Sequence, residues 1–258
     1  MNPEVPAPRV NLLLRAILAL VAAAASGAAL PAQSPHTVSA TYNVYMNGAH
    51  VGVMNETYEA KDSTYRITSE SVPLGALALF QKPGTVVSTG RLTPEGLQPE
   101  RFEGRAIGRG QVRAEFDWPG ERLSFGRDGK TETVALPAGT QDRLSIMYQF
   151  MFQPFQGAEQ LDVAMTDGRR LARYRYDIER GVEIDTPLGR IGTLHLVRQS
   201  QEASGNEKAG GNEKAGGNEI WLAPGRHFLP VRMVIREDNG TRYEQVATRI
   251  EVKGAARR

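Results

Sequence analysis

The sequence predicts an all-β, mainly antiparallel protein: a strongly curved sheet or incomplete barrel of about 12–14 strands with one or two short covering helices. Three observations carry this prediction. Apolar and polar residues alternate along most of the 258 residues. Turn signals such as Asn47-Gly48 and Asp238-Asn239-Gly240 separate the alternating runs. A sheet of this many strands must also curl or close, because wide flat sheets are rare.

Each alternating run places apolar side chains on one face and polar side chains on the other, which is typical of an antiparallel sheet with one face in a core. The first run contains Tyr42, Val44 and Met46 and leads into Asn47-Gly48, the strongest short hairpin signal. Later runs repeat the pattern at 112–118, 161–165, 172–178, 229–235 and 246–252.

Two segments depart from the alternation. Val72 to Phe80 is too apolar for a surface loop and ends at Pro83-Gly84. Residues 143–152 predict a helix that is capped by Thr140 or Asp142 and stopped by Pro154. Its apolar stripe has helical spacing and consists of Leu144, Met147, Tyr148 and Met151. We expect both segments to cover the open face of the sheet.

Residues 1–32 have the pattern of a secretory signal peptide, since Arg9 and Arg15 precede an apolar run at 16–25. This run is shorter than the roughly 20 residues of a membrane-spanning helix. Small residues at its end predict cleavage after Ala32 or Ala29, which leaves no transmembrane anchor. The chain has no cysteine for lipid attachment or disulfides. We expect an exported protein in the periplasm of a Gram-negative bacterium.

Residues 33–258 are predicted to form a single β-rich domain. The stretch at 205–218 repeats Gly-Asn-Glu-Lys-Ala-Gly, and is too short and polar for a solenoid. We expect it to be an inserted, mobile hairpin loop. The formal net charge of +2 gives no electrostatic reason to expect a nucleic-acid partner.

No pattern predicts a catalytic residue, a metal site or a cofactor. The four histidines are scattered, and His195 lies in an alternating run where a packed or solvated strand side chain is expected. Asp142 and Ser145 are three residues apart at the start of the predicted helix, where capping explains them. The glycine-rich stretch at 104–110 joins strand to strand, unlike a phosphate-binding loop.

The remaining candidates for a site are apolar. Aromatic and methionine side chains on the strands and on the two covering segments either fill the core or line a pocket for an adaptable apolar ligand. The candidate ligand-lining residues are Leu77, Phe80, Trp118, Met147, Phe150, Met151 and Trp221.

Eight short motifs follow one another in order along residues 40–250. They are Tyr42-Asn43-Val44-Tyr45, Ser88-Thr89-Gly90, Leu97 to Phe102, Phe116-Asp117-Trp118, Gln141 to Ser145, Thr186 to Gly189, Trp221 to Pro224 and Leu229 to Arg232. Together they resemble the exported bacterial proteins grouped as the domain of unknown function DUF3108. The resemblance implies an exported β-rich protein of unknown function, and it brings no catalytic residues.

Three functions are compatible with these observations. The first is non-enzymatic binding of an apolar envelope component, a lipid or a lipidated chain such as a lipoprotein acyl chain, inside the curved sheet. The second is a structural or assembly factor with a solid core and another envelope protein as partner. The third is a hydrolase. An apolar cavity of about 300 Å³ or more favours the first. A packed interior favours the second, and buried carboxylates or a His–Asp contact in a cleft favour the third.

Overall fold

The computed structural model describes residues 35–107, 110–127, 130–199, 217–237 and 239–254. The predicted signal segment at 1–32 lies outside these residues, and so does all of the repeat insertion except Gly217 and Asn218. None of the helices in the described ranges is both long and apolar enough to cross a membrane.

The described strands form one sheet in the order β8-β7-β6-β5-β4-β3-β2-β1-β15-β14-β13-β12-β11-β10-β9, and only the β9–β10 pair is parallel. This confirms the predicted fold class, with 15 strands where alternation predicts about 12–14. The bounds of the first eight are β1 (Thr37–Met46), β2 (Ala49–Lys61), β3 (Thr64–Pro73), β4 (Gly84–Thr93), β5 (Gly96–Ala106), β6 (Gly110–Asp117), β7 (Arg122–Arg127) and β8 (Lys130–Ala135). The others are β9 (Gln141–Asp142), β10 (Gln160–Thr166), β11 (Leu171–Thr186), β12 (Gly189–Arg198), β13 (Glu219–Ala223), β14 (Leu229–Arg236) and β15 (Arg242–Lys253).

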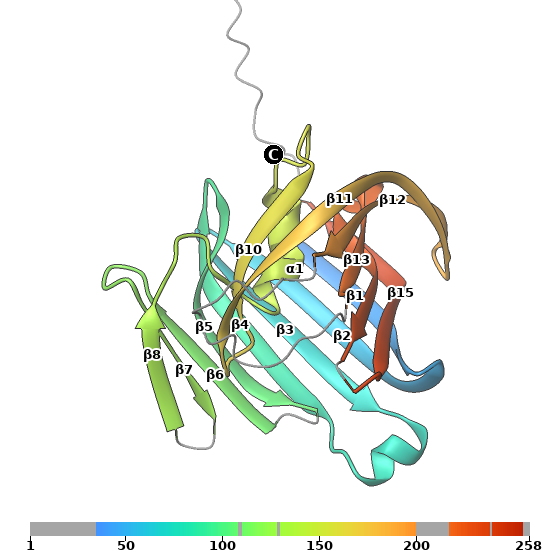
Figure 1. Ribbon diagram of the computed structural model, residues 1–258, viewed down its shortest axis with the longest axis horizontal. Coiled ribbons are helices and arrows are strands. Elements are labelled where there is room, and N and C mark those ends of the chain that lie inside the picture. The colour runs from blue at the N-terminus through green and yellow to red at the C-terminus, as the bar shows by residue number, and fades with distance from the viewer. Residues whose placement is uncertain (1–34, 108–109, 128–129, 200–216, 238, 255–258) are drawn as a thin grey trace, which may run out of the picture. The chain divides into compact units, whose positions relative to one another are not determined.

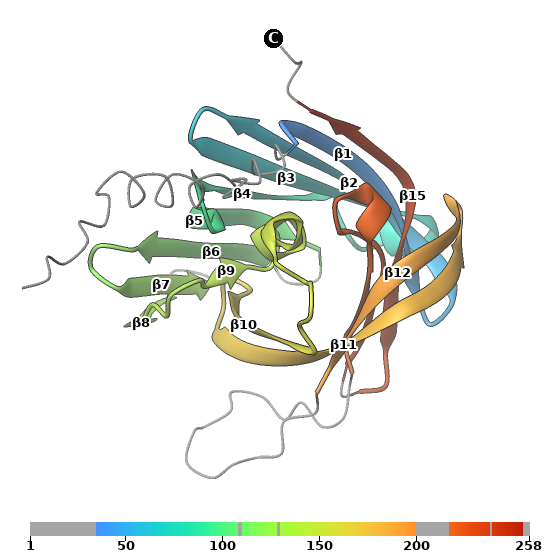
Figure 2. The same ribbon diagram turned by 90° about the horizontal axis from the view of Figure 1, so that it is seen from above.

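The sheet curls around the helix α1 (Ser145–Gln149), as Figure 2 shows from above. The end strands β8 and β9 do not pair with each other in the described order, so the sheet is not closed into a barrel. Alternate residues point inward, as the period of two along a strand requires. On β1, for example, Val38, Ala40 and Tyr42 are buried, while the residues between them are only partly buried.

The predicted helix at 143–152 is shorter than expected. Its α-helical part is Ser145–Gln149, and a 3₁₀ turn, η3 (Phe150–Phe152), follows. It begins late because Gln141 and Asp142 pair with β10 as β9, and the Arg143 amide donates to the Thr166 carbonyl at 3.0 Å. Leu144 and Tyr148 pack into one buried cluster, whereas Ile146 and Phe150 pack into another. The helix is therefore enclosed on several sides, and is not a lid with one apolar stripe.

The side chain of Gln149 fixes α1 to the β4–β5 turn. Its Oε1 accepts the Leu97 amide at 2.6 Å, and its Nε2 donates to the Glu95 carbonyl at 2.9 Å. Gly96 permits this approach, because it has a φ of +111° and a Cβ there would lie 2.4 Å from Gln149 Oε1.

The expectation that the segment from Val72 to Phe80 avoids the surface is wrong. It forms the end of β3 and a 3₁₀ helix, η2 (Gly75–Leu79), in which no residue is buried. Leu79 and Phe80 are 80% and 81% exposed. The physical reason is that η2 projects past the end of the sheet between β3 and β4, at the lower right of Figure 1.

Candidate functional site

The inner face of the curled sheet borders a cavity of about 740 Å³, which is within the size range of small-molecule sites. Its wall comes from β1 to β5, from α1 and from β10 to β15, and it is rich in aliphatic residues. Five of the seven methionines of the chain line it: Met46, Met54, Met147, Met165 and Met233. Thioether side chains adapt to irregular apolar shapes, so this wall suits an apolar ligand of variable form.

Three of the seven predicted ligand-lining residues line this cavity: Leu77, Met147 and Phe150. The cavity wall also contains methionines at alternating positions of the strands. They are not among the predicted ligand-lining residues, because those candidates were taken from aromatic residues and from the two covering segments. The signal that would have found them is the inward register of Met46, Met165 and Met233 in the alternating runs.

The other four predicted residues lie elsewhere. Trp118 stacks on Phe116 and donates from Nε1 to the Pro99 carbonyl at 2.6 Å. Met151 packs against the buried cluster that contains Leu144 and Tyr148. Trp221 stacks on His195, and Phe80 is exposed on the β3–β4 connection. Aromatic character alone therefore does not distinguish a cavity wall from a packed core or an exposed tip.

Three carboxyl-bearing residues of the described chain line the cavity, Glu56, Asp167 and Glu237, and of these only Glu56, on β2, is buried. It is 7% exposed, and its Oε2 accepts a hydrogen bond from the Tyr148 hydroxyl at 3.1 Å. Burial raises the pKa of Glu56 to about 7, although hydrogen bonds from Tyr148 and Ser69 and the nearby charge of Arg143 offset part of this effect. Sequence reasoning missed Glu56. The available signal is its place in the inward register of β2, between Gly52 and Tyr58.

A second buried carboxyl group, that of Asp142, fixes the start of α1. Asp142 is fully buried, and its Oδ1 accepts the amides of Leu144 and Ser145 at 2.8 Å each. Its Oδ2 accepts the Ser88 hydroxyl of β4 at 2.6 Å. Burial raises the pKa of Asp142, and these hydrogen bonds offset the increase only in part. Of the two predicted capping residues, Thr140 and Asp142, it is therefore Asp142 whose side chain accepts the first amides of the helix.

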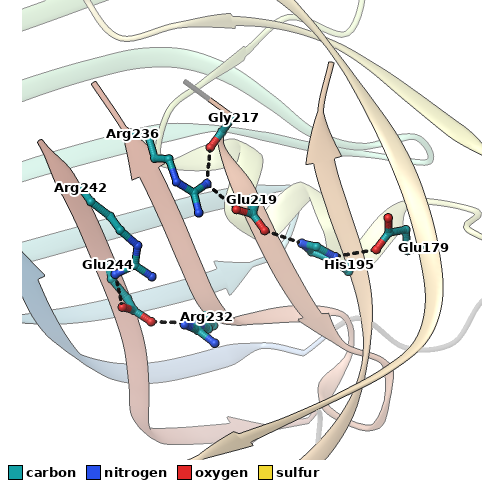
Figure 3. A network of polar contacts seen from close by, with 8 residues as sticks. All are labelled: Glu179, His195, Gly217, Glu219, Arg232, Arg236, Arg242 and Glu244. Atoms are coloured by element: carbon teal, nitrogen blue, oxygen red, sulfur yellow. Dashed lines mark hydrogen bonds and ion pairs between the residues drawn. The ribbon is translucent and has the colours of Figure 1, made fainter. Parts of the chain in front are cut away.

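Strands β11 to β15 carry a ladder of alternating charges, which Figure 3 shows. His195 is 8% exposed, and its Nδ1 and Nε2 contact Glu179 at 2.9 Å and Glu219 at 3.1 Å. Its ring stacks on Trp221 with centroids 4.3 Å apart. Glu219 also accepts a hydrogen bond from Arg236.

This ladder does not resemble a metal site. The two carboxylates contact opposite nitrogens of one ring, so the three groups do not converge on a point. Within the described ranges, no group of three His, Asp or Glu side chains is placed to hold a metal ion. Because Ile220 lines the cavity and alternates with Glu219 and Trp221, those two side chains point away from the cavity, whereas Arg236, at the end of β14, reaches its rim.

A second hollow, of about 720 Å³, lies over β3 to β8. Its walls include Thr85, Val87 and Thr89, which alternate with the inward-facing Val86 and Ser88. Surface ion pairs, such as Arg101 to Glu115 at 2.9 Å, occupy much of it. Exposed pairs of this kind are already satisfied by each other, so the hollow offers less to a ligand than the methionine-lined cavity.

The fold and the cavity define a class: an all-β protein with an apolar, ligand-sized cavity inside a curved and unclosed sheet. The chain belongs to the family described as "Protein of unknown function (DUF3108)", which matches residues 41–247. The resemblance seen in the sequence motifs is thereby confirmed.

Among solved structures, the chain matches one described as "a putative lipoprotein from Parabacteroides distasonis ATCC 8503". The two chains share 13% identity with a TM-score of 0.33, over 85% of this chain and 96% of that chain. No curated protein matches this sequence.

Proposed function

We propose that this protein is a non-enzymatic binder of an apolar envelope component, a lipid or a lipidated chain, which occupies the cavity inside the curved sheet. The observation that carries the proposal is the cavity itself, about 740 Å³ in volume and lined by five methionines. This volume exceeds the roughly 300 Å³ at which apolar pockets begin to accept drug-sized ligands. A structural factor with a solid core is less well supported for the same reason.

The proposed location is the cell envelope, in the periplasm of a Gram-negative bacterium. The support is the signal-like pattern of residues 1–32, in which Arg9 and Arg15 precede a short apolar run. A binder of lipid in that compartment shields an acyl chain from water between two membranes, which is the role that an adaptable apolar cavity serves best.

The test uses displacement of a fluorescent fatty-acid analogue from the purified protein. Met147→Trp fills the cavity from α1 and should weaken probe binding about tenfold or more, since a tenfold change corresponds to only about 1.4 kcal/mol. Met165→Trp fills it from β10 and should act in the same way. Native mass spectrometry of the protein purified from its periplasm should also show a co-purifying lipid.

Met151→Trp is the matched control, because Met151 lies one turn further along from Met147 and does not line the cavity. It should leave probe affinity within about twofold. If folded Met147→Trp and Met165→Trp proteins bind the probe as the parent does, the cavity is not the binding site. If the parent neither binds the probe nor carries a lipid, the function is not apolar binding.

Hydrolysis is the second candidate, and Glu56 is the observation that favours it. A carboxyl group with a pKa near 7 in an apolar wall has the property of a general acid. In that case Glu56→Gln should abolish turnover of an ester of a long-chain acid while leaving probe affinity unchanged. If the parent protein itself shows no turnover, this candidate is excluded for such esters.

A further inference from the structure

The large apolar side chains that are exposed in the described part of the chain are all in one place. They are Val72, Leu79 and Phe80, which are 40%, 80% and 81% exposed. Leu79 and Phe80 lie in the connection between β3 and β4, and Val72 lies at the end of β3 just before it. We call residues 72–84, from the end of β3 to the first residue of β4, the β3–β4 tip. Leu79 is the last residue of the 3₁₀ helix η2, which projects beyond the sheet in Figure 1, and Phe80 follows it as the C-cap. These two consecutive exposed apolar residues are called the apolar point.

The β3–β4 tip stands at the mouth of the cavity. Its residues Pro73, Leu77 and Gln81 line the cavity, whereas Leu79 and Phe80 do not. The tip is held beside the β1–β2 hairpin, because the Leu74 amide donates to the Val51 carbonyl at 2.8 Å. An apolar surface thus runs from the exposed point along the tip to the methionine-lined interior.

The rim around this mouth is basic. Strand ends that line the cavity contribute four arginines, Arg105, Arg170, Arg198 and Arg236, against the two carboxylates Asp167 and Glu237. Arg236 pairs with Glu219, and Arg170 and Arg198 also have protein partners. With Glu219 included, the four arginines still outnumber the three carboxylates Asp167, Glu219 and Glu237. Lys82 adds an exposed cation two residues after Phe80.

These features fit a bilayer surface better than a protein surface. Two large side chains on a short turn bury far less than the roughly 800 Å² per partner of a stable protein interface. An apolar point flanked by cations is instead the arrangement that inserts into the boundary between acyl chains and anionic headgroups. We propose that the β3–β4 tip docks on a bilayer that contains anionic phospholipid, with Leu79 and Phe80 inserted and the cavity mouth held at the membrane.

This inference rests on the proposed apolar ligand, because docking gives that ligand a route into the cavity without crossing water. The two are nevertheless separable by experiment. Leu79 and Phe80 lie outside the cavity wall, so changing them leaves the binding site intact.

The experiment is co-sedimentation of the purified protein with vesicles of phosphatidylcholine alone and of phosphatidylcholine with 30% phosphatidylglycerol. The parent protein should bind the anionic vesicles more tightly, and added salt should weaken this binding. The double variant Leu79→Ser, Phe80→Ser should lose about tenfold or more of this affinity, because each buried apolar side chain is a substantial part of the insertion energy. Its affinity for the fatty-acid probe in solution should stay within about twofold of the parent.

The matched control is Leu188→Ser, which removes a half-buried apolar side chain from the β11–β12 turn, outside the β3–β4 tip and the cavity wall. It should leave vesicle binding unchanged. The docking proposal is overturned if the parent does not sediment with anionic vesicles, or if the double variant sediments as the parent does. It is equally overturned if sedimentation velocity shows a parent dimer that the double variant loses, because a second copy then covers the tip. Probe binding that persists in any of these cases leaves the proposed function standing.

Discussion

Two regions of the inner face share one sequence pattern but are filled differently. The first, which we call the filled region, contains the buried side chains of Tyr58, Phe102, Leu123 and Tyr148. Tyr58, Phe102 and Leu123 have no exposed surface, and the ring centroids of Tyr58 and Tyr148 stack 5.3 Å apart. In the second, the hollow region, five methionines surround the cavity and each is only partly buried. Apart from Tyr148 and Met147 of α1, the residues of both regions come from strands with the same alternation of apolar and polar residues.

The difference shows that alternation predicts which face a residue occupies, but not whether that face is filled. Aromatic rings have fixed shapes and gain energy from stacking on each other, so they favour a solid interior. Methionine has three rotatable bonds and no fixed shape, so it borders a space that different ligands can fill. Residue type within the inward register is therefore the more informative signal.

The largest expected effect breaks the filled region. Phe102→Ala should lower the free energy of unfolding by about 3–5 kcal/mol, because Phe102 has no exposed surface and its loss leaves a new void. Urea denaturation followed by tryptophan fluorescence measures it. A loss below about 1 kcal/mol would mean that this region is not tightly packed, and the contrast with the hollow region would fail.

The antiparallel, curved sheet could be predicted because alternation and turn signals are local in sequence. The pattern around Tyr42 and Asn47-Gly48, for instance, is sufficient for the β1–β2 hairpin. The identity of the cavity wall depends instead on how far the sheet curls and on where α1 lies within it. Met147 and Trp221 are equally apolar in sequence, yet only Met147 faces the cavity, because His195 and Arg232 cover the Trp221 ring on the other face.

The inward register of β2 places Glu56 on the inner face, but the partners of the two buried carboxyl groups could not be predicted from the sequence. Glu56 is one charged residue in a strand whose neighbours are mostly polar, and its carboxyl group is stabilised inside by one partner on the adjacent strand and one on the distant helix α1. Those partners are Ser69 on β3 and Tyr148 on α1. Asp142 was predictable as a helix cap because capping is local, whereas its contact with Ser88 spans 54 residues.

The next effect tests the polar anchor between the filled region and α1. Asp142→Ala removes the acceptor of two amides and of the Ser88 hydroxyl, all of them buried. The expected loss in the free energy of unfolding is about 3 kcal/mol, because each unsatisfied buried donor costs about 1–3 kcal/mol. Asp162→Ala is the matched control. It breaks only an exposed pair with Arg175, so it should cost less than about 1 kcal/mol. Equal losses for the two variants would contradict the anchor.

The free energy of unfolding should depend on pH through Glu56, the buried carboxyl group in the wall of the hollow region. The folded pKa of Glu56, about 7, lies above the 4.5 of a solvated glutamate, so the folded protein binds this proton more tightly than the unfolded chain. The resulting stability is complete below about pH 4.5 and is lost as pH rises toward about 7. The loss is at most about 3 kcal/mol, since each unit of pKa shift corresponds to 1.36 kcal/mol.

Glu56→Gln should remove this dependence, so that the variant exceeds the parent in stability above about pH 7 and matches it near pH 4. Urea denaturation of both proteins at intervals between pH 4 and 8 measures the difference. Asp142 and the other ionisable groups are common to the two proteins, so their contributions cancel in this subtraction. Parallel curves for parent and variant would show that Glu56 is not the titrating group.

The smallest expected effect comes from the hollow region. Met233→Ala shortens a side chain that already borders open space, so it creates no new enclosed void of the kind that makes Met→Ala changes in a packed core cost about 2–5 kcal/mol. We expect a loss below about 1 kcal/mol in the free energy of unfolding, measured without ligand. The same variant enlarges the cavity, so bulkier apolar probes should gain affinity relative to slender ones. A loss as large as that of Phe102→Ala would mean that the methionines are packed core residues, and that the cavity does not persist in solution.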